Sequence, residues 1–160
     1  MFFYENLEET MKHFSESGGF LSVNGGGSLN TMTVSWGFAG FMWNKPHFVT
    51  VVRPQRYTEE LLKKANSFTI SVPFDGLKKE LAECGSKSGR DVEKSEIVRF
   101  IPSKSVESPI VGGCDMYYEC KIKYIDHFDG DLLSESIKSN FYKSDFHNIY
   151  IGEIVECYTK

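Results

Sequence analysis

The sequence predicts a mostly β protein, an antiparallel barrel that carries a few short, peripheral helices. Three observations support this fold class. Stretches rich in β-branched and aromatic residues outnumber the stretches with helical spacing. The helical stretches are short, and glycines or prolines bound several of the segments. The length of 160 residues suits one domain, residues 1–160, with a core of its own.

An amphipathic helix is expected at the start of the chain, followed by a run of strands. Leu7, Met11 and Phe14 recur at helical spacing with charged residues between them, and two glycines close the segment. The glycine run over 24–28 predicts a hairpin turn, because it lacks the GxxxxGK[ST] order of a phosphate loop and no helix pattern follows it. The strands expected in this half span residues 20–23, 30–38, 47–53 and 67–72.

The connections in the first half carry weaker signals. The connection over 37–46 has room for a further short strand. A helix is expected over 57–66, with Thr58 placed to cap it. Another is expected over 75–84, where Gly85 stops the helix.

Two long strands are expected near the end of the chain. The segment 116–128 alternates, with Tyr118 on the face predicted to be buried and Glu119 on the face predicted to be exposed. The last strand spans 149–158, and Gly152 within it indicates a bulge or a close approach of another chain segment.

Composition argues against several function classes. The net charge is −4 and no basic run dominates a segment, so nucleic-acid binding is not expected. No apolar stretch approaches the length of a membrane span, and the first residues lack a secretory apolar run, so a cytoplasmic protein without membrane association is expected. The four cysteines have irregular spacing without a CxxC pair, so free thiols are expected and no metal site is predicted.

Two donor-rich stretches indicate an anion site. Arg56 and Thr58 stand where a strand ends and a helix begins, a place where free backbone N–H groups favour a phosphate. Ser88, Arg90 and Lys94 form a second set in a polar, glycine-broken loop. Each set alone is more typical of solvated side chains than of an anion site. Together, and beside a hydroxyl-rich strand, they favour a phosphate site.

The hydroxyl-rich strand suits a flat polar ligand. Asn30, Thr33 and Ser35 carry hydrogen-bonding side chains, and the period of a strand points the latter two to the same face. The alternative is a partly exposed strand with surface hydroxyls. His147 is the one candidate for a proton-handling group, although a surface histidine is equally typical of its position before a strand.

Several stretches together resemble a known family. NTMTVSWG, RPQRYT, FTISVP, CGSKSGRDVEK and HNIYIGEIVE look like the corresponding stretches of the flavin reductase-like, FMN-binding split-barrel proteins, the flavoredoxin group in particular. The match follows the order of the chain from about Gly19 to Glu156. The resemblance implies an antiparallel Greek-key split β-barrel over residues 1–160 that forms a homodimer, with FMN bound near the subunit interface.

The resemblance also implies a set of cofactor-binding residues in three places. The isoalloxazine and ribityl region would be lined by Asn30, Met32, Thr33, Ser35 and Trp36. The first phosphate wall would consist of Arg53, Gln55, Arg56, Tyr57 and Thr58, where Gln55 replaces a small hydroxyl residue frequent in the family. The second wall would consist of Ser88, Gly89 and Lys94, with Arg90 nearby. The segment 94–109 departs from the family pattern, and nothing is inferred from it.

The function that the resemblance implies is that of an FMN-dependent oxidoreductase. It would act as an NAD(P)H:flavin reductase or as a flavoredoxin-like electron transfer protein, with NADH or NADPH as candidate donors and a small molecule or a protein as redox partner. No catalytic residue is assigned, because the cofactor carries the chemistry. The alternative is a non-enzymatic flavin-binding, ligand-binding or sensor module on the same barrel.

Overall fold

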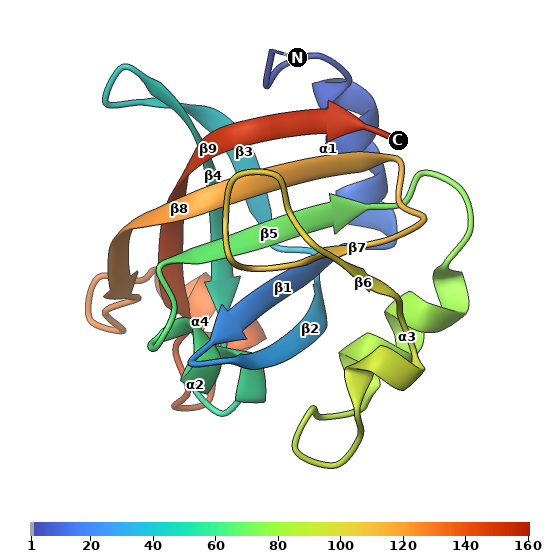
Figure 1. Cartoon of the computed structure of the whole chain (residues 1–160). Helices are drawn as coiled ribbons and strands as arrows, with labels where there is room; N and C mark the ends of the chain where they lie inside the picture. Colours follow the sequence, from blue (N-terminus) through green and yellow to red (C-terminus); the bar gives the residue numbers. More distant parts are fainter. Residues whose placement is uncertain (1) are drawn as a thin grey trace.

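A seven-stranded antiparallel sheet forms the body of the protein in a computed structural model that describes residues 2–160 (Figure 1). Its strands follow the order β2-β1-β5-β8-β9-β4-β3. They span β1 (Gly19–Gly25), β2 (Ser28–Val34), β3 (Gly37–Met42), β4 (Lys45–Val52), β5 (Ser67–Val72), β8 (Met116–His127) and β9 (Asn148–Thr159). A second sheet pairs the two short strands β6 (Phe100–Ile101) and β7 (Ile110–Val111).

The large sheet is rolled into an open barrel. β2 and β3 are its two edges, yet only Ser35 and Trp36 separate the end of one from the start of the other. Three peptide steps span at most about 11 Å, so the two edges must lie close together. The Thr50 hydroxyl on β4 donates to the Trp36 carbonyl at 3.4 Å across this split. The expected mostly β, antiparallel barrel is confirmed, with the split between β2 and the β3–β4 pair.

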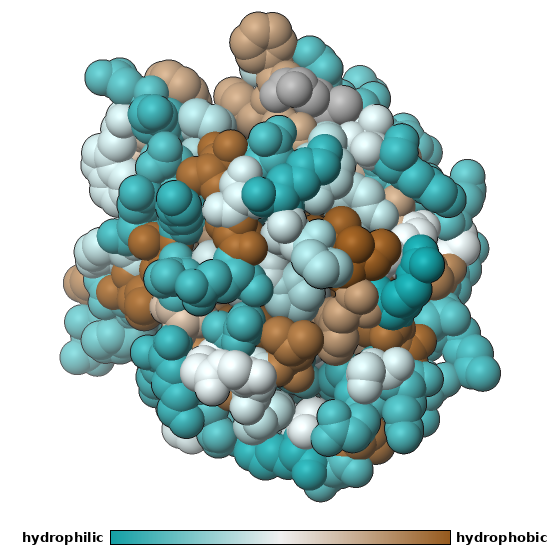
Figure 2. Space-filling model, in the orientation of Figure 1, coloured by the Kyte–Doolittle hydropathy of each residue, from teal (hydrophilic) through white to brown (hydrophobic). Residues whose placement is uncertain are grey.

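The core fills the inside of this barrel. Phe48, Phe68, Tyr118 and Tyr150 are fully buried there, and Phe14 of the first helix packs against them. Gly152 lies where two strands approach closely, since a Cβ at this position would be 2.7 Å from the Phe68 ring. The close approach expected at this glycine is therefore confirmed. On the outside, hydrophilic side chains mix with dispersed apolar patches in the view of Figure 2.

Tight turns join the first four strands into two hairpins. Gly26 and Gly27 have φ angles of 63° and 90° in the β1–β2 turn, a backbone conformation that favours glycine, so the expected hairpin is confirmed. The strand expected over 30–38 is wrong in its extent, because the chain leaves β2 at Val34 and crosses the split before β3 begins. The short strand anticipated in the connection over 37–46 is β3 itself, which pairs with β4.

Four α-helices and one 3-10 turn lie around the barrel within residues 2–160. They are α1 (Leu7–Glu16), α2 (Tyr57–Leu62), α3 (Lys78–Ser86), α4 (Glu135–Phe141) and the 3-10 turn η1 (Lys94–Glu96). α2 is shorter than the predicted helix over 57–66, and α3 runs through Gly85 instead of stopping before it. No helix was expected at α4, which buries none of its residues.

The expectation that Thr58 caps α2 is wrong. The N-cap position belongs to Arg56, and no side chain forms a capping hydrogen bond there. Thr58 lies inside the first turn, where it is buried and its hydroxyl accepts a hydrogen bond from the Asn30 amide at 2.8 Å. The Thr58 hydroxyl, which the sequence pattern assigned to capping α2, therefore forms a tertiary contact with β2 instead.

The expected exposure of Glu119 is also wrong. Its side chain is fully buried, and its carboxylate accepts hydrogen bonds from the backbone N–H groups of Lys104 and Ser105 at 2.8 and 2.7 Å. The Tyr158 hydroxyl donates to the same carboxylate at 2.7 Å. The connection between β6 and β7 covers the outer face of β8 here, so this half of the strand is buried on both faces. Its second half is mostly exposed on both faces, so the predicted alternation of a buried and an exposed face is wrong there as well.

Two further expectations concern the cysteines and membrane-spanning segments. Cys84, Cys114 and Cys120 are buried free thiols, as predicted, and burial raises the pKa of the Cys120 thiol well above its ordinary value. None of the helices within residues 2–160 is long and apolar enough to cross a membrane.

Candidate functional site

Two cavities meet at the split of the barrel and form one groove. The first has a volume of about 190 Å³ and lies between the ends of β2 and β4. The second has about 260 Å³ and lies between the start of α2 and the loop after α3. Met32 and Arg56 line both cavities, so the two adjoin, and together they are called the groove. We call the first the strand-end half and the second the cationic half.

The groove brings together all the residues that the sequence analysis proposed for cofactor binding. The strand-end half is lined by Met32, Thr33, Ser35, Trp36, Arg53 and Arg56. The cationic half is lined by Asn30, Met32, Gln55, Arg56, Tyr57, Thr58, Ser88, Gly89, Arg90 and Lys94. Their shared location is a structural fact, whereas their binding of FMN stays a prediction.

The groove also contains Lys87, which the sequence did not single out, and His147, which the sequence indicated only as a candidate proton-handling group. Lys87 lines the cationic half, and its place between Ser86 and Ser88 in the donor-rich loop was the available signal. His147 lines the strand-end half although it follows β4 by almost a hundred residues. Only the pairing of β9 with β4 brings it there.

Three exposed cationic side chains give the cationic half its charge. The Arg56 guanidinium makes one long contact, 3.4 Å, to the Gly85 carbonyl. Arg90 donates to the Gln55 carbonyl at 3.1 Å and pairs with Glu60. Lys87 pairs with Glu83 at 2.5 Å. These surface pairs are weak and exchangeable, so the three cations are available to an anion.

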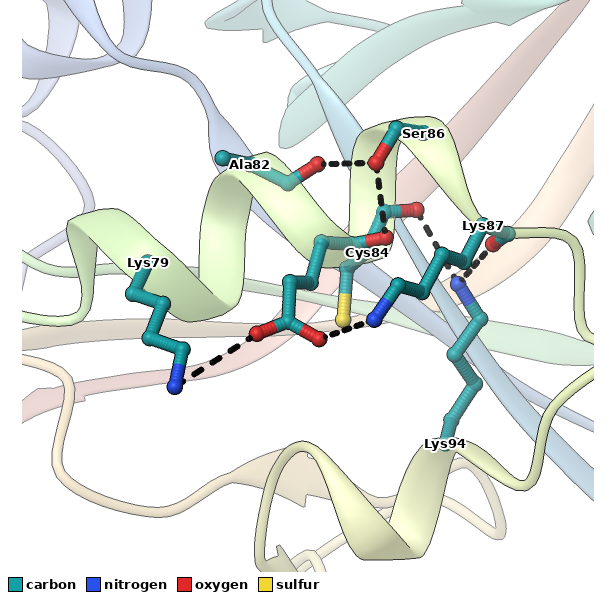
Figure 3. Close-up of polar contacts among 7 residues, drawn as sticks. Lys79, Ala82, Cys84, Ser86, Lys87 and Lys94 are labelled. Atoms are coloured by element: carbon teal, nitrogen blue, oxygen red, sulfur yellow. Dashed lines mark hydrogen bonds and ion pairs between the residues drawn. The ribbon is translucent and has the colours of Figure 1, made fainter.

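Lys94 is a buried lysine that anchors the loop of the cationic half. Its side chain is 3% exposed, and its ammonium donates to the carbonyls of Cys84 at 3.0 Å and Lys87 at 2.6 Å (Figure 3). Burial lowers the pKa of this lysine. Because the ammonium is held by carbonyls at the end of α3, Lys94 fixes the loop that carries Ser88 and Arg90.

A buried acceptor without a partner lies at the wall of the cationic half. Asn30 is 2% exposed, its amide nitrogen donates to Thr58, and its Oδ1 has no hydrogen-bond partner among the described residues. Gly89 packs directly against it, since a Cβ there would be 2.2 Å from Oδ1 and 2.8 Å from the Tyr57 ring. A buried carbonyl left without a donor costs about 1–3 kcal/mol. The wall is thus prepared for a ligand or water that donates a hydrogen bond.

In the strand-end half a carboxylate offsets the charge of the arginine. Arg53 donates to Asp145 at 2.8 Å and to the Phe141 carbonyl at 3.0 Å. Gln55 donates to the same Asp145 oxygen at 2.9 Å. The hydrogen bonds from Gln55 and Arg53 lower the pKa of Asp145. This network ties the connection between α4 and β9 to the groove.

His147 is neutral in the strand-end half. Burial, with the nearby positive charges of Arg53 and Arg56, lowers its pKa to about 4. Its Nδ1 lies 2.8 Å from the Tyr142 hydroxyl, and its ring packs against Trp36 at 5.0 Å between ring centroids. A neutral imidazole offers one donor and one acceptor, so one ring nitrogen remains for a ligand in the groove.

The two hydroxyls expected to face a ligand together differ in their availability. Thr33 donates to the Leu81 carbonyl of α3 at 2.6 Å, so its hydroxyl proton is committed to holding that helix against β2. Ser35 lies beyond the end of β2 in the link across the split, where it is exposed and lines the strand-end half. Ser35 is therefore the more accessible donor of the two.

Comparison with known proteins identifies the class as that of flavin-related oxidoreductases. The family model described as "Flavin reductase like domain" matches residues 11–160, nearly the whole chain. The protein belongs to this family, which confirms the resemblance seen in the sequence.

Relatives and solved structures agree with this membership. A protein of Pyrococcus abyssi described as uncharacterised is 29% identical over 138 residues, 81% of this chain and 79% of its own. Flavoredoxin from Methanosarcina acetivorans superposes with a TM-score of 0.73 at 23% identity, over 90% of this chain and 68% of that one. An FMN-binding protein from Thermus thermophilus, with bound 1-cyclohex-2-enone, gives 0.71 at 25% identity, over 89% and 69%. These likenesses confirm the split-barrel fold.

Proposed function

We propose that this protein binds FMN in the groove and acts as an oxidoreductase that takes electrons from NADH or NADPH. It passes them to a small molecule or to a protein partner. One observation carries the proposal: the groove has exposed cationic side chains at one end, whereas at the other end Asp145 offsets the charge of Arg53 and the lining includes the rings of Trp36 and His147. An FMN molecule has the same asymmetry, a phosphate at one end of a ribityl chain and a flat ring at the other.

The residues of the groove fit this cofactor. Arg56, Lys87 and Arg90 supply the charge that a phosphate dianion requires. The unpartnered Oδ1 of Asn30 can accept a hydrogen bond from a ribityl hydroxyl. The absence of a side chain at Gly89 keeps this wall open. The unpartnered Oδ1 is a cost to the folded chain, and a donor on a bound flavin would remove it.

The chain's own residues would bind and orient the cofactor. FMN, when bound, supplies the hydride and electron chemistry. Arg56 and Arg90 would hold the phosphate, and Lys94 would keep the loop that carries Arg90 in place. Neutral His147 would offer a hydrogen bond to the ring end without adding charge there.

The first experiment is a titration of purified protein with FMN. Binding quenches flavin fluorescence, and a flavin that copurifies absorbs near roughly 450 nm. Riboflavin, which lacks the phosphate, serves as the matched ligand and is expected to bind at least tenfold more weakly. A colourless protein that fails to bind added FMN contradicts the proposal.

Rapid mixing of the FMN-loaded protein with NADH and with NADPH then tests the enzymatic role. Bleaching of the flavin absorbance within seconds supports a reductase. A flavin that binds but is bleached by neither nucleotide favours the electron carrier, the binding module or the sensor.

We also propose that the protein forms a homodimer through the β3–β4 hairpin. Phe38, Phe41 and Trp43 are 56%, 66% and 60% exposed there. Aromatic side chains exposed together favour a protein interface. Sedimentation analysis tests this: the native chain is expected to be a dimer and Phe41→Glu a monomer. A native chain that sediments as a monomer refutes it.

A further inference from the structure

A third cavity adjoins the strand-end half of the groove and differs from it in chemistry. We propose that this apolar cavity binds a neutral aromatic molecule of one or two rings that carries a hydrogen-bond-accepting oxygen. Its volume is about 550 Å³, within the range of about 300–1,000 Å³ typical of small-molecule sites.

The walls of the apolar cavity are aromatic and aliphatic side chains from separate parts of the chain. Phe38 of β3 and Ile149 of β9 form one side, and Ile137 and Phe141 of α4 form the other. Trp36 meets Phe141 edge-on with 5.4 Å between ring centroids. Aromatic walls that meet at this angle leave faces and edges on which a further ring can pack.

The lining selects against charged ligands. None of its eleven residues carries a charge, and only Trp36 and Tyr142 have a polar side-chain atom. The phosphates of a nicotinamide dinucleotide would find no partner here and would lose their hydration, which is costly. The exposed cations Arg56, Lys87 and Arg90 line the cationic half of the groove instead.

The two polar atoms of the lining call for an acceptor on the ligand. An indole N–H only donates. The Tyr142 hydroxyl lies 2.8 Å from Nδ1 of His147. When this nitrogen carries the imidazole proton and donates to Tyr142, the hydroxyl proton is free for a ligand oxygen. A neutral carbonyl or ether oxygen can accept from either donor.

The position of the cavity connects it to the proposed cofactor. Trp36 and Val51 line both the apolar cavity and the strand-end half, so a molecule bound here lies beside the expected place of the flavin ring. The role of a ligand bound next to the flavin ring rests on the proposed function. Binding of the ligand requires no flavin and can be measured without it.

Isothermal titration with acetophenone tests the site, since this molecule is neutral, has one ring and carries one carbonyl oxygen. We expect it to bind both the flavin-free and the FMN-loaded protein. Benzoate has nearly the same size and a negative charge, and its affinity is expected to be at least tenfold lower.

Three variants locate the binding. Ile137→Glu places a charge in the lining and is expected to weaken acetophenone binding at least tenfold, while FMN affinity is unchanged because Ile137 does not line the groove. Leu132→Glu is the matched control, since Leu132 is 84% exposed and outside the lining. Tyr142→Phe is expected to weaken binding about 3- to 10-fold, the loss of one hydrogen bond.

Three results would overturn the inference. If the wild-type protein binds no acetophenone, the proposed site does not exist. If that protein is also a dimer and Ile137→Glu dissociates it, a second copy of the chain covers the cavity. Binding that disappears on FMN loading means that the cofactor itself fills the cavity. Binding that Ile137→Glu leaves intact lies elsewhere. The first and third results are independent of the proposed cofactor function. The second presupposes that FMN binds, which its separately measured affinity establishes.

Discussion

The two halves of the groove are built in opposite ways. The cationic half is assembled from a short helix and a loop. Its charged groups are on exposed side chains that form weak surface ion pairs. The strand-end half is assembled from the ends of strands, and its charged and titratable groups are tied into a network. Arg53 is paired with Asp145, and His147 is neutral.

This difference separates affinity from orientation. Exposed cations with exchangeable partners can turn to a phosphate at little cost, so the cationic half is expected to supply most of the binding free energy. Fixed side chains on strand ends cannot adapt, so the strand-end half is expected to set the position and environment of the ring. The predictions below test this division, from the largest expected effect to the smallest.

Gly89→Val is expected to have the largest effect. Its Cβ would be 2.2 Å from the buried Oδ1 of Asn30, and the valine methyls would project into the cationic half. Overpacking of this kind costs about 1–3 kcal/mol, and it would also displace Asn30 from Thr58. FMN binding should fall by at least about 100-fold, measured by fluorescence titration. Gly40→Val is the control, because the nearest atom to a Cβ at Gly40 is 4.0 Å away in β3; an equal loss there would contradict the prediction.

Arg56→Ala tests the source of the affinity. Removing one charge-assisted hydrogen bond should weaken FMN binding by roughly 1.5–3 kcal/mol. Riboflavin binding should change little, because it has no phosphate, so the preference for FMN over riboflavin should shrink. Lys64→Ala removes a charge from an exposed lysine just after α2 and should change neither affinity. An unchanged FMN affinity in Arg56→Ala would remove the phosphate assignment.

The pH dependence of stability tests the neutral state of His147. Its pKa is about 4 in the folded protein against an ordinary 6.5, so the unfolded chain binds the proton more readily between these values. Its contribution to stability is therefore complete above pH 6.5 and is lost as the pH falls toward 4. Urea unfolding should show about 1–2 kcal/mol more destabilisation between pH 7 and 5 in the native chain than in His147→Gln. His127→Gln, which removes an exposed histidine, should follow the native curve.

Asp145→Asn should have the smallest effect. It removes the carboxylate that offsets Arg53, so a less compensated positive charge remains beside the ring end of the groove. A positive charge favours electron-rich states, so the midpoint potential of bound flavin should rise by a few tens of millivolts at most, since the pair is partly solvated. FMN affinity should change little. A fall in potential would show that Arg53 has turned away from the groove. Asp75→Asn, in the connection between β5 and α3, is the control of equal charge.

The sequence by itself determined the class of fold and the donor-rich segments. Turns, strand ends and alternation are local properties, which is why β5 and the β1–β2 hairpin were predicted well. The family motifs are local as well and could be found in the sequence. The residues that they indicated all line the groove.

Tertiary structure alone decided how those residues are used. The burial of Glu119, the contact of Thr58 with Asn30 and the bonding of Lys94 to the end of α3 each depend on a segment distant in sequence. The inclusion of His147 in the groove depends on the pairing of β9 with β4. A side chain's type sets which hydrogen bonds it can form, but only the packed chain sets which partner is within reach, because that distance belongs to two segments and not to one.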